Sequence, residues 1–150
     1  MNKVYYAHLR KTISSLTEGE EDVVSLMATM VCELHHSDHR FDWTGFYRVT
    51  SPGMLKIGPY QGSHGCLKIP FERGVCGAAA RLGKTQLVAD VEAFEGHIAC
   101  ASSTMSELVL PVWDKAGALI AVLDIDSDQP NAFTEQDAAE LEIILAKVFS

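Results

Sequence analysis

The sequence predicts a single α+β domain in which an antiparallel sheet is flanked by helices at both ends of the chain. Apolar residues recur every three or four positions near the two ends, as in amphipathic helices, and alternate in two central pairs of segments, as in strands. The 150 residues suffice for one domain with its own core, which we expect to span residues 1–150. We expect the helices to pack on one face of the sheet and to leave the other face free for a ligand.

Two helices are predicted at the start of the chain. Residues 4–17 carry an apolar stripe made of Tyr6, Leu9, Ile13 and Leu16. Thr17 and Glu20 have the spacing of a capping box, which predicts that the second helix begins there. The apolar stripe of this second helix consists of Val23, Met27, Met30, Val31 and Leu34.

Two β-hairpins are predicted in the middle of the chain. FDWTGFYRVT alternates in polarity, turns at SPG and returns as MLKIGPYQG, which indicates the first hairpin. One face of its first strand carries Phe41, Trp43, Gly45, Tyr47 and Val49. A short helix between Gly74 and Gly83 and a brief strand in QLVAD follow. The second hairpin pairs SELVLPVW with ALIAVLDIDS across the turn DKAG.

The last helix is predicted in TEQDAAELEIILAKVF, where Thr134 can cap the first turn. Its core stripe consists of Ala138, Leu141, Leu145 and Val148. No internal repeat or low-complexity tract interrupts the sequence, which agrees with one domain.

Charge and composition argue against several classes of function. The net charge of −8 opposes the phosphate backbone, and no run of lysine or arginine offsets it, so we expect no nucleic-acid partner. No segment is apolar enough to cross a membrane, and the first residues lack the apolar region of a secretory signal, so we expect a soluble cytoplasmic protein. In a reducing compartment its four cysteines are more often buried, metal-bound or catalytic than cross-linked.

Three carboxylates are expected to converge on the second hairpin. Glu107 shares a strand face with Val109, and Asp124 shares one with Asp126. Like charges brought together away from water raise one another's pKa, so a positive group should sit among them. A metal ion or the ammonium group of a ligand would serve equally well. The alternative is that these acids lie at strand ends and face water.

The cysteines differ in their local sequence. Cys76 lies near a predicted helix N-terminus, where amide groups favour the thiolate, and Cys100 follows His97 by three residues in a loop of small residues. Either could be nucleophilic, although a single cysteine is more often a small core residue, and we keep that interpretation for Cys32. The sequence around Cys66 does not indicate whether this cysteine is reactive or structural.

Two groups of histidine and cysteine residues could bind a metal ion but have simpler interpretations. His64 with Cys66 and His97 with Cys100 could supply four ligands, but their spacings match no familiar structural zinc site, so we expect no metal. His35 and His39, one helical turn apart, are expected to be a solvated helix end.

Five motifs in the same order resemble the free methionine-(R)-sulfoxide reductases, which are built on a GAF domain. They are DWTGFY, GVCGAAA, VADV, GHIACASSTMSELVLPV and VLDIDS, and they cover roughly residues 41–127. The resemblance implies that Cys100 is the catalytic cysteine, whose thiolate attacks the sulfoxide sulfur and is left as a sulfenic acid. It implies that Cys66 resolves this intermediate to a disulfide and that Cys76 has an auxiliary or alternative resolving role. Thioredoxin would then restore the thiols.

The resemblance also implies a substrate pocket. Glu107, Asp124 and Asp126 match the acids that hold the substrate, and Trp43 and Tyr47 match the aromatic residues around its methyl group and side chain. Free methionine sulfoxide carries an ammonium group that a methionine inside a polypeptide lacks, so buried acids would select the free amino acid. No cofactor is expected, and the family precedent favours a homodimer. Which carboxyl donates a proton, and whether Cys66 or Cys76 resolves first, stay open.

A non-catalytic GAF sensor is the alternative function. Such a module would bind a small molecule or nucleotide and pass a signal to a partner. The three matched cysteines favour the enzyme, because a sensor has no use for them. The loop SSTMSE between Cys100 and Glu107 departs from the family's more polar loop, but it removes no matched residue.

Overall fold

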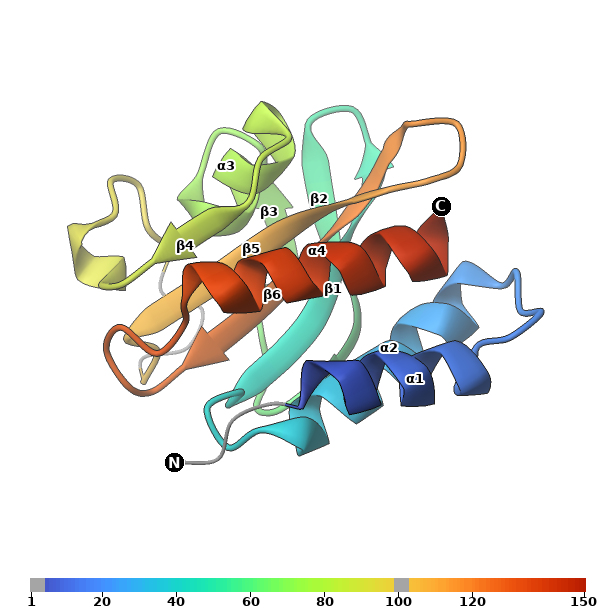
Figure 1. Ribbon diagram of the computed structural model, residues 1–150. Helices are drawn as coiled ribbons and strands as arrows, with labels where there is room; N and C mark the ends of the chain where they lie inside the picture. The colour runs from blue at the N-terminus through green and yellow to red at the C-terminus, as the bar shows by residue number, and fades with distance from the viewer. Residues whose placement is uncertain (1–4, 99–102) are drawn as a thin grey trace.

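The computed structural model describes residues 5–98 and 103–150, and within these residues the chain forms one antiparallel sheet with helices on both faces (Figure 1). The helices are α1 (Tyr6–Leu16), α2 (Val23–Ser37), α3 (Gly74–Leu82) and α4 (Glu135–Phe149), with a 3-10 turn at Val91–Ala93. The strands are β1 (Trp43–Ser51), β2 (Met54–Gln61), β3 (Lys68–Pro70), β4 (Gln86–Val88), β5 (Ser106–Trp113) and β6 (Leu119–Ser127). They lie in the order β3-β2-β1-β6-β5-β4.

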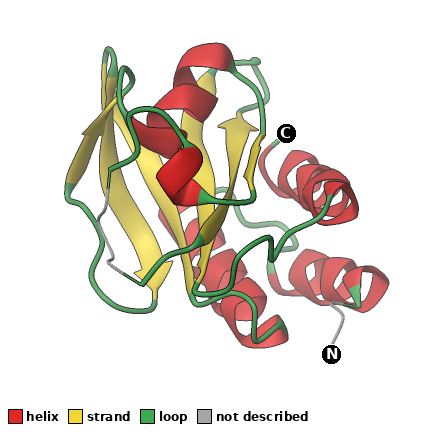
Figure 2. Cartoon of the chain, turned by 90° about the vertical axis from the view of Figure 1, so that its left-hand side faces the viewer, coloured by secondary structure: helices red, strands yellow, loops and turns green. Residues whose placement is uncertain are grey.

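The larger apolar core lies between the sheet and the helices α1, α2 and α4, which gather on one side of it (Figures 1 and 2). Phe46, Leu123 and Ile125 point into this core from the central strands and are fully buried. Ile13 and Leu141 meet them from the helices. The prediction that the terminal helices flank an antiparallel sheet is therefore confirmed.

The opposite face of the sheet was expected to be free, but α3 partly covers it. Val75 and Ala79 of this helix pack with Val109 and Val122 of the central strands in a second, smaller core. The reason is that seven consecutive residues of α3 are buried, so this short helix needs an apolar surface to cover it. The part of this face beyond α3 holds the candidate site. None of the helices in the described ranges has the length and apolarity that a bilayer crossing requires.

The connection between α1 and α2 differs from the prediction. Thr17 and Glu20 do not form a capping box: the Thr17 hydroxyl donates to the carbonyl of Ile13 at the end of α1. Asp22 caps α2 instead, accepting hydrogen bonds from the two backbone amides that follow Val23. The chain uses residues 17–22 to reverse direction between two packed helices, so Val23 lies at an exposed end.

Other departures occur where elements are short. Phe41 precedes β1 and belongs to the helix-side core, because its backbone is not part of the alternating strand. The three-residue strand β3 and the 3-10 turn were not anticipated, since so few residues give no periodic signal. Thr134 does cap α4, and Asp137 completes a capping box there.

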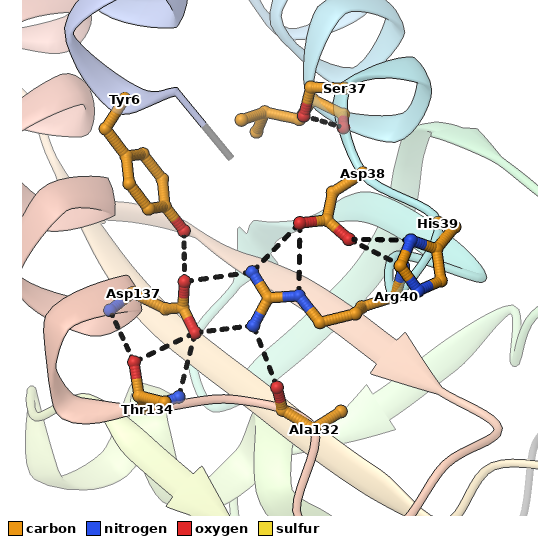
Figure 3. A network of polar contacts seen from close by, with 9 residues as sticks. Tyr6, Ser37, Asp38, His39, Arg40, Ala132, Thr134 and Asp137 are labelled. Carbon is orange, nitrogen blue, oxygen red and sulfur yellow. Dashed lines mark hydrogen bonds and ion pairs between the residues drawn. The ribbon is translucent and has the colours of Figure 1, made fainter. Parts of the chain in front are cut away.

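Asp137 also connects the C-terminal helix to the N-terminal part of the chain (Figure 3). Its carboxylate accepts hydrogen bonds from the Tyr6 hydroxyl at 2.6 Å and from the Arg40 guanidinium at 2.9 and 3.1 Å. Arg40 donates further to Asp38 and to the backbone carbonyl of Ala132. This network links α1, the segment before β1 and α4.

Burial raises the pKa of Asp137, but the hydrogen bonds from Arg40 and Tyr6 outweigh it and leave the pKa below its ordinary value. The Asp137–Arg40 side chains are only 6% and 11% exposed, so solvent screens their attraction weakly. The stability that Asp137 contributes is fully present above its unfolded-state pKa and is lost as the pH falls through its lower folded-state pKa.

We expect Asp137→Asn to lower the free energy of unfolding by about 2 to 4 kcal/mol at neutral pH, because Arg40 then loses a buried charged partner. Urea unfolding measures this change. Glu140→Gln serves as the control. It removes the charge that pairs with Arg10 in a more exposed ion pair than Asp137–Arg40, and should cost less than about 1 kcal/mol. Equal losses in the two variants would contradict the role given to Asp137.

Candidate active site

The strand register brings the three acids together on the face that α3 partly covers. Asp126 pairs with Glu107 on β5 and with Trp43 on β1, so these side chains form one row across three strands. Asp124 pairs with Val109 and with Gly45 in the next row. Directly paired residues of antiparallel strands point to the same face, so the acids converge because of the pairing.

A small cavity of about 30 Å³ lies over these rows. Six of the predicted site residues line it: Trp43, Tyr47, Cys76, Glu107, Asp124 and Asp126. This volume holds about one or two water molecules, so an amino acid enters only if the lining side chains move apart. Cys66 packs against the same apolar cluster and is disulfide-bonded. Cys100 lies outside the described residues.

Glu107 and Asp124 are buried and Asp126 is half-buried with one enclosed carboxylate oxygen, so the alternative that these acids face water is wrong. Glu107 is 6% exposed and Asp124 is 4% exposed. Burial raises the pKa of Glu107, Asp124 and Asp126 well above the ordinary range, and the neighbouring carboxylates raise it further. The Oδ1 atoms of Asp124 and Asp126 have no hydrogen-bond partner among residues 5–98 and 103–150. This charge arrangement favours a ligand that brings a positive group.

Cys76 lies in the first turn of α3, as predicted, but its thiol is not activated there. Its Sγ is 4.0 Å from Oε2 of Glu107. Burial raises the pKa of Cys76, and the nearby charges of Asp124 and Glu107 raise it further, so burial and the acids together outweigh the helix N-terminus. Cys32 also differs from the prediction, because it is exposed on α2 rather than buried in the core.

Aromatic rings form one wall of the cavity. The Trp43 ring stacks against both Tyr47 and Tyr60, with ring centroids 5.8 and 5.3 Å away. Its Nε1–H donates to the carbonyl of Ser63 at 2.7 Å. A Cβ at Gly45 would lie 2.5 Å from the Trp43 ring, so glycine is required beneath it. Sequence reasoning missed the contact of Tyr60 with Trp43, although Tyr60 stands in the predicted second strand.

The connecting loops supply the rest of the lining. His64 and His97, which the sequence singled out as possible zinc ligands, both line this cavity. Partial burial lowers the pKa of His97, with Glu92 opposing the shift, so its imidazole is neutral at neutral pH. Gly65, Ile98 and Thr104 also line the cavity and were not predicted, because no local pattern connects these loops to the strands.

We expect the buried acids to make the protein less stable as the pH rises, because the folded state binds their protons more tightly than the unfolded state. The raised pKa values favour folding below the unfolded-state pKa, and this advantage is lost as the pH rises through the folded-state values. Asp124→Asn should therefore unfold with a shallower pH dependence and be about 1 to 3 kcal/mol more stable at neutral pH. Urea titrations across acid and neutral pH test this, with the exposed Asp128→Asn as control. Identical pH profiles for Asp124→Asn and wild type would contradict it.

Comparison with known proteins assigns the family. A family model described as a GAF domain matches residues 17–148. The free methionine-R-sulfoxide reductase of Escherichia coli is 38% identical over 149 residues, which cover 99% of this chain and 89% of that protein. The fRMsr of Staphylococcus aureus in complex with substrate is 36% identical, with a TM-score of 0.92 over 99% of this chain and 95% of that chain. The Neisseria meningitidis free methionine-R-sulfoxide reductase, in complex with its substrate, is 39% identical, with a TM-score of 0.89 over 95% of this chain and 85% of that chain. This chain therefore belongs to the GAF-domain family of the free methionine-R-sulfoxide reductases.

Proposed function

We propose that this protein reduces free L-methionine-(R)-sulfoxide to methionine. The observation that carries the proposal is the cluster of three poorly solvated carboxylates beside an aromatic wall. The relatives from Escherichia coli and Neisseria meningitidis, which are named for this activity, support it over most of the chain.

The acids account for the choice of a free amino acid. Glu107, Asp124 and Asp126 offer negative oxygens in a poorly solvated space, where an ammonium group offsets their mutual repulsion. A methionine sulfoxide within a polypeptide has an amide in place of the ammonium group and gains nothing from these charges. Trp43 and Tyr47 would then contact the substrate's methyl group and side chain and fix the orientation of the sulfur.

Cys100 is the proposed nucleophile. Its thiolate attacks the sulfoxide sulfur, and the net change transfers one oxygen atom from the substrate to the Cys100 sulfur, giving methionine and a sulfenic acid. The proton that the thiol gives up is matched by a proton delivered to the sulfoxide oxygen. Burial and mutual repulsion raise the pKa of Glu107, Asp124 and Asp126, so one of the three can stay protonated and deliver this proton while the remaining negative oxygens face the ammonium group.

Cys66 is the proposed resolving cysteine. Its thiol condenses with the Cys100 sulfenic acid to form a disulfide and release water. Cys66 is half-buried and is followed by Leu67, which is 66% exposed, so a reductant can approach this loop. Cys76 is less suited to the step, because its thiol is buried and has a raised pKa.

The proposed chemistry also requires a reductant and a reducing compartment. Thioredoxin would reduce the disulfide and return both cysteines to thiols, which requires the reducing conditions of the cytoplasm. We further propose that the protein acts as a homodimer. The chemistry runs entirely on the protein's own thiols and carboxyls, so the proposal includes no cofactor.

A single-turnover experiment tests the proposed function. Reduced protein incubated with free methionine-(R)-sulfoxide, without reductant, should release about one methionine and lose about two thiols per chain. Cys100→Ser should release none, and Cys66→Ser should release about one methionine while losing only about one thiol, because the sulfenic acid has no partner. Cys32→Ser is the matched control and should behave as wild type.

Two results would contradict the proposal. Methionine release by Cys100→Ser would show that Cys100 is not the nucleophile. No release by the wild-type protein would favour a non-catalytic GAF sensor. The S epimer provides the specificity control and should yield no methionine, because the pocket fixes both the methyl group and the oxygen.

A further inference from the structure

Three ligand atoms of the kind that bind metals meet in the cavity wall. Sγ of Cys76 and carboxylate oxygens of Glu107 and Asp124 all lie within 4.8 Å of one another, and all three residues are buried. Sγ of Cys76 is 4.0 Å from Oε2 of Glu107. A tetrahedral zinc site has a sulfur–oxygen edge of roughly 3.5 Å, so less than about 1 Å of side-chain movement brings this pair to coordinating distance.

Unpartnered carboxylate oxygens point to a missing positive group. In the described part of the chain, Oδ1 of Asp124 and Oδ1 of Asp126 are buried without a hydrogen-bond partner. Asp124 is 4% exposed and lines the cavity. None of the described residues that line the cavity is a lysine or an arginine, so the lining supplies no positive side chain to these oxygens.

The cavity has the size of an ion. Its volume of about 30 Å³ holds about one or two water molecules, so a single metal ion fits between the walls once the ligand side chains have closed on it. An amino acid needs the walls to separate. A cation between the three ligand atoms therefore needs little rearrangement beyond the ligands themselves.

We propose that this cavity binds a zinc-type divalent cation through Cys76, Glu107 and Asp124, and that the bound cation excludes the substrate. A donor set of one sulfur and several carboxylate oxygens suits Zn²⁺ and Cd²⁺, whereas Mg²⁺ and Ca²⁺ prefer oxygen ligands alone. Binding replaces by the metal the thiol proton of Cys76 and any proton held by Glu107 or Asp124, and releases these protons to solvent. The metal site stands independently of the reaction, and only the exclusion of substrate rests on the proposed function.

The bound metal ion should inhibit the enzyme reversibly, because it occupies the carboxylates that select the substrate. Glu107 and Asp124 cannot hold a metal ion and an ammonium group at once, because both cations need the same oxygens. Zn²⁺ should therefore raise the apparent KM for methionine sulfoxide and leave kcat unchanged.

A Cd²⁺ titration tests the site without any catalytic step. The triple variant Cys32→Ser, Cys66→Ser, Cys100→Ser keeps Cys76 as its one thiol, so a sulfur-to-cadmium charge-transfer band in the ultraviolet reports only this residue. We expect one Cd²⁺ to bind per chain with this band, and Zn²⁺ to displace it. Further replacement of Cys76 by serine should abolish the band.

The carboxylate ligands are tested in the same single-thiol protein. Glu107→Gln and Asp124→Asn should each weaken Cd²⁺ binding by about tenfold or more, because each removes a ligand charge while keeping the side-chain shape. Asp128→Asn removes an exposed carboxylate nearby and should change binding less than about twofold. Circular dichroism checks that each variant is folded.

Two outcomes overturn the metal site: no thiol-dependent band in the folded single-thiol protein, or a band that is insensitive to both Glu107→Gln and Asp124→Asn. In the wild-type enzyme, Zn²⁺ inhibition that lowers kcat at saturating substrate would overturn the exclusion of substrate. A protein that binds Cd²⁺ as expected but releases no methionine would leave the site standing and contradict the proposed function alone.

Discussion

The burial of three carboxyls on one face of the central strands constrains the rest of the structure. Asp124 and Asp126 alternate along β6 with Leu123 and Ile125, which are fully buried under the helices. A slip of β6 by one residue would exchange the two sets, placing the acids in the apolar core and the leucine and isoleucine at the cavity. The helix-side core therefore fixes the register, and the register places the acids beside Glu107 on β5.

The same arrangement joins stability to ligand choice. Carboxyls held near one another in a poorly solvated cavity raise each other's pKa and cost folding free energy. The apolar core beneath α1, α2 and α4 offsets this cost from the opposite face of the sheet. A cation that enters the cavity relieves the repulsion, so an ammonium group and a soft divalent metal ion are attracted by the same feature. Cys76 adds a sulfur ligand that only the metal can use.

Much of the fold could be predicted from the sequence, because long periodic segments carry their own signal. The alternating residues of both hairpins and the stripes of the terminal helices predicted an antiparallel sheet with flanking helices, and the alternation around Asp124 predicted that the acids would meet. The predictions that failed rested on local sequence patterns, and contacts with distant parts of the chain overrode them. Thr17 matched a capping box but lies at the end of α1, and Cys76 stands at a helix N-terminus but has its pKa raised by burial and by the neighbouring acids.

Other features of the site had no signal in the chain. His64 and His97 stood out only by their spacing from cysteines, and their shared place in the cavity wall comes from the packing of two loops. Tyr60 stacks on Trp43 because the first hairpin brings β2 beside β1, and a sequence pattern does not indicate which ring covers another. The covering of the second face by α3 depends on the tertiary packing of a helix of only nine residues.

The central claim is that buried carboxylates choose the substrate by its ammonium group. The most direct test compares kcat/KM for free methionine-(R)-sulfoxide with that for its N-acetyl derivative, which keeps the sulfoxide but lacks the positive charge. The wild-type enzyme should prefer the free amino acid by more than about 30-fold, and Glu107→Gln with Asp126→Asn should lose most of this preference. Equal kcat/KM values for the two compounds in the wild-type enzyme would contradict the claim.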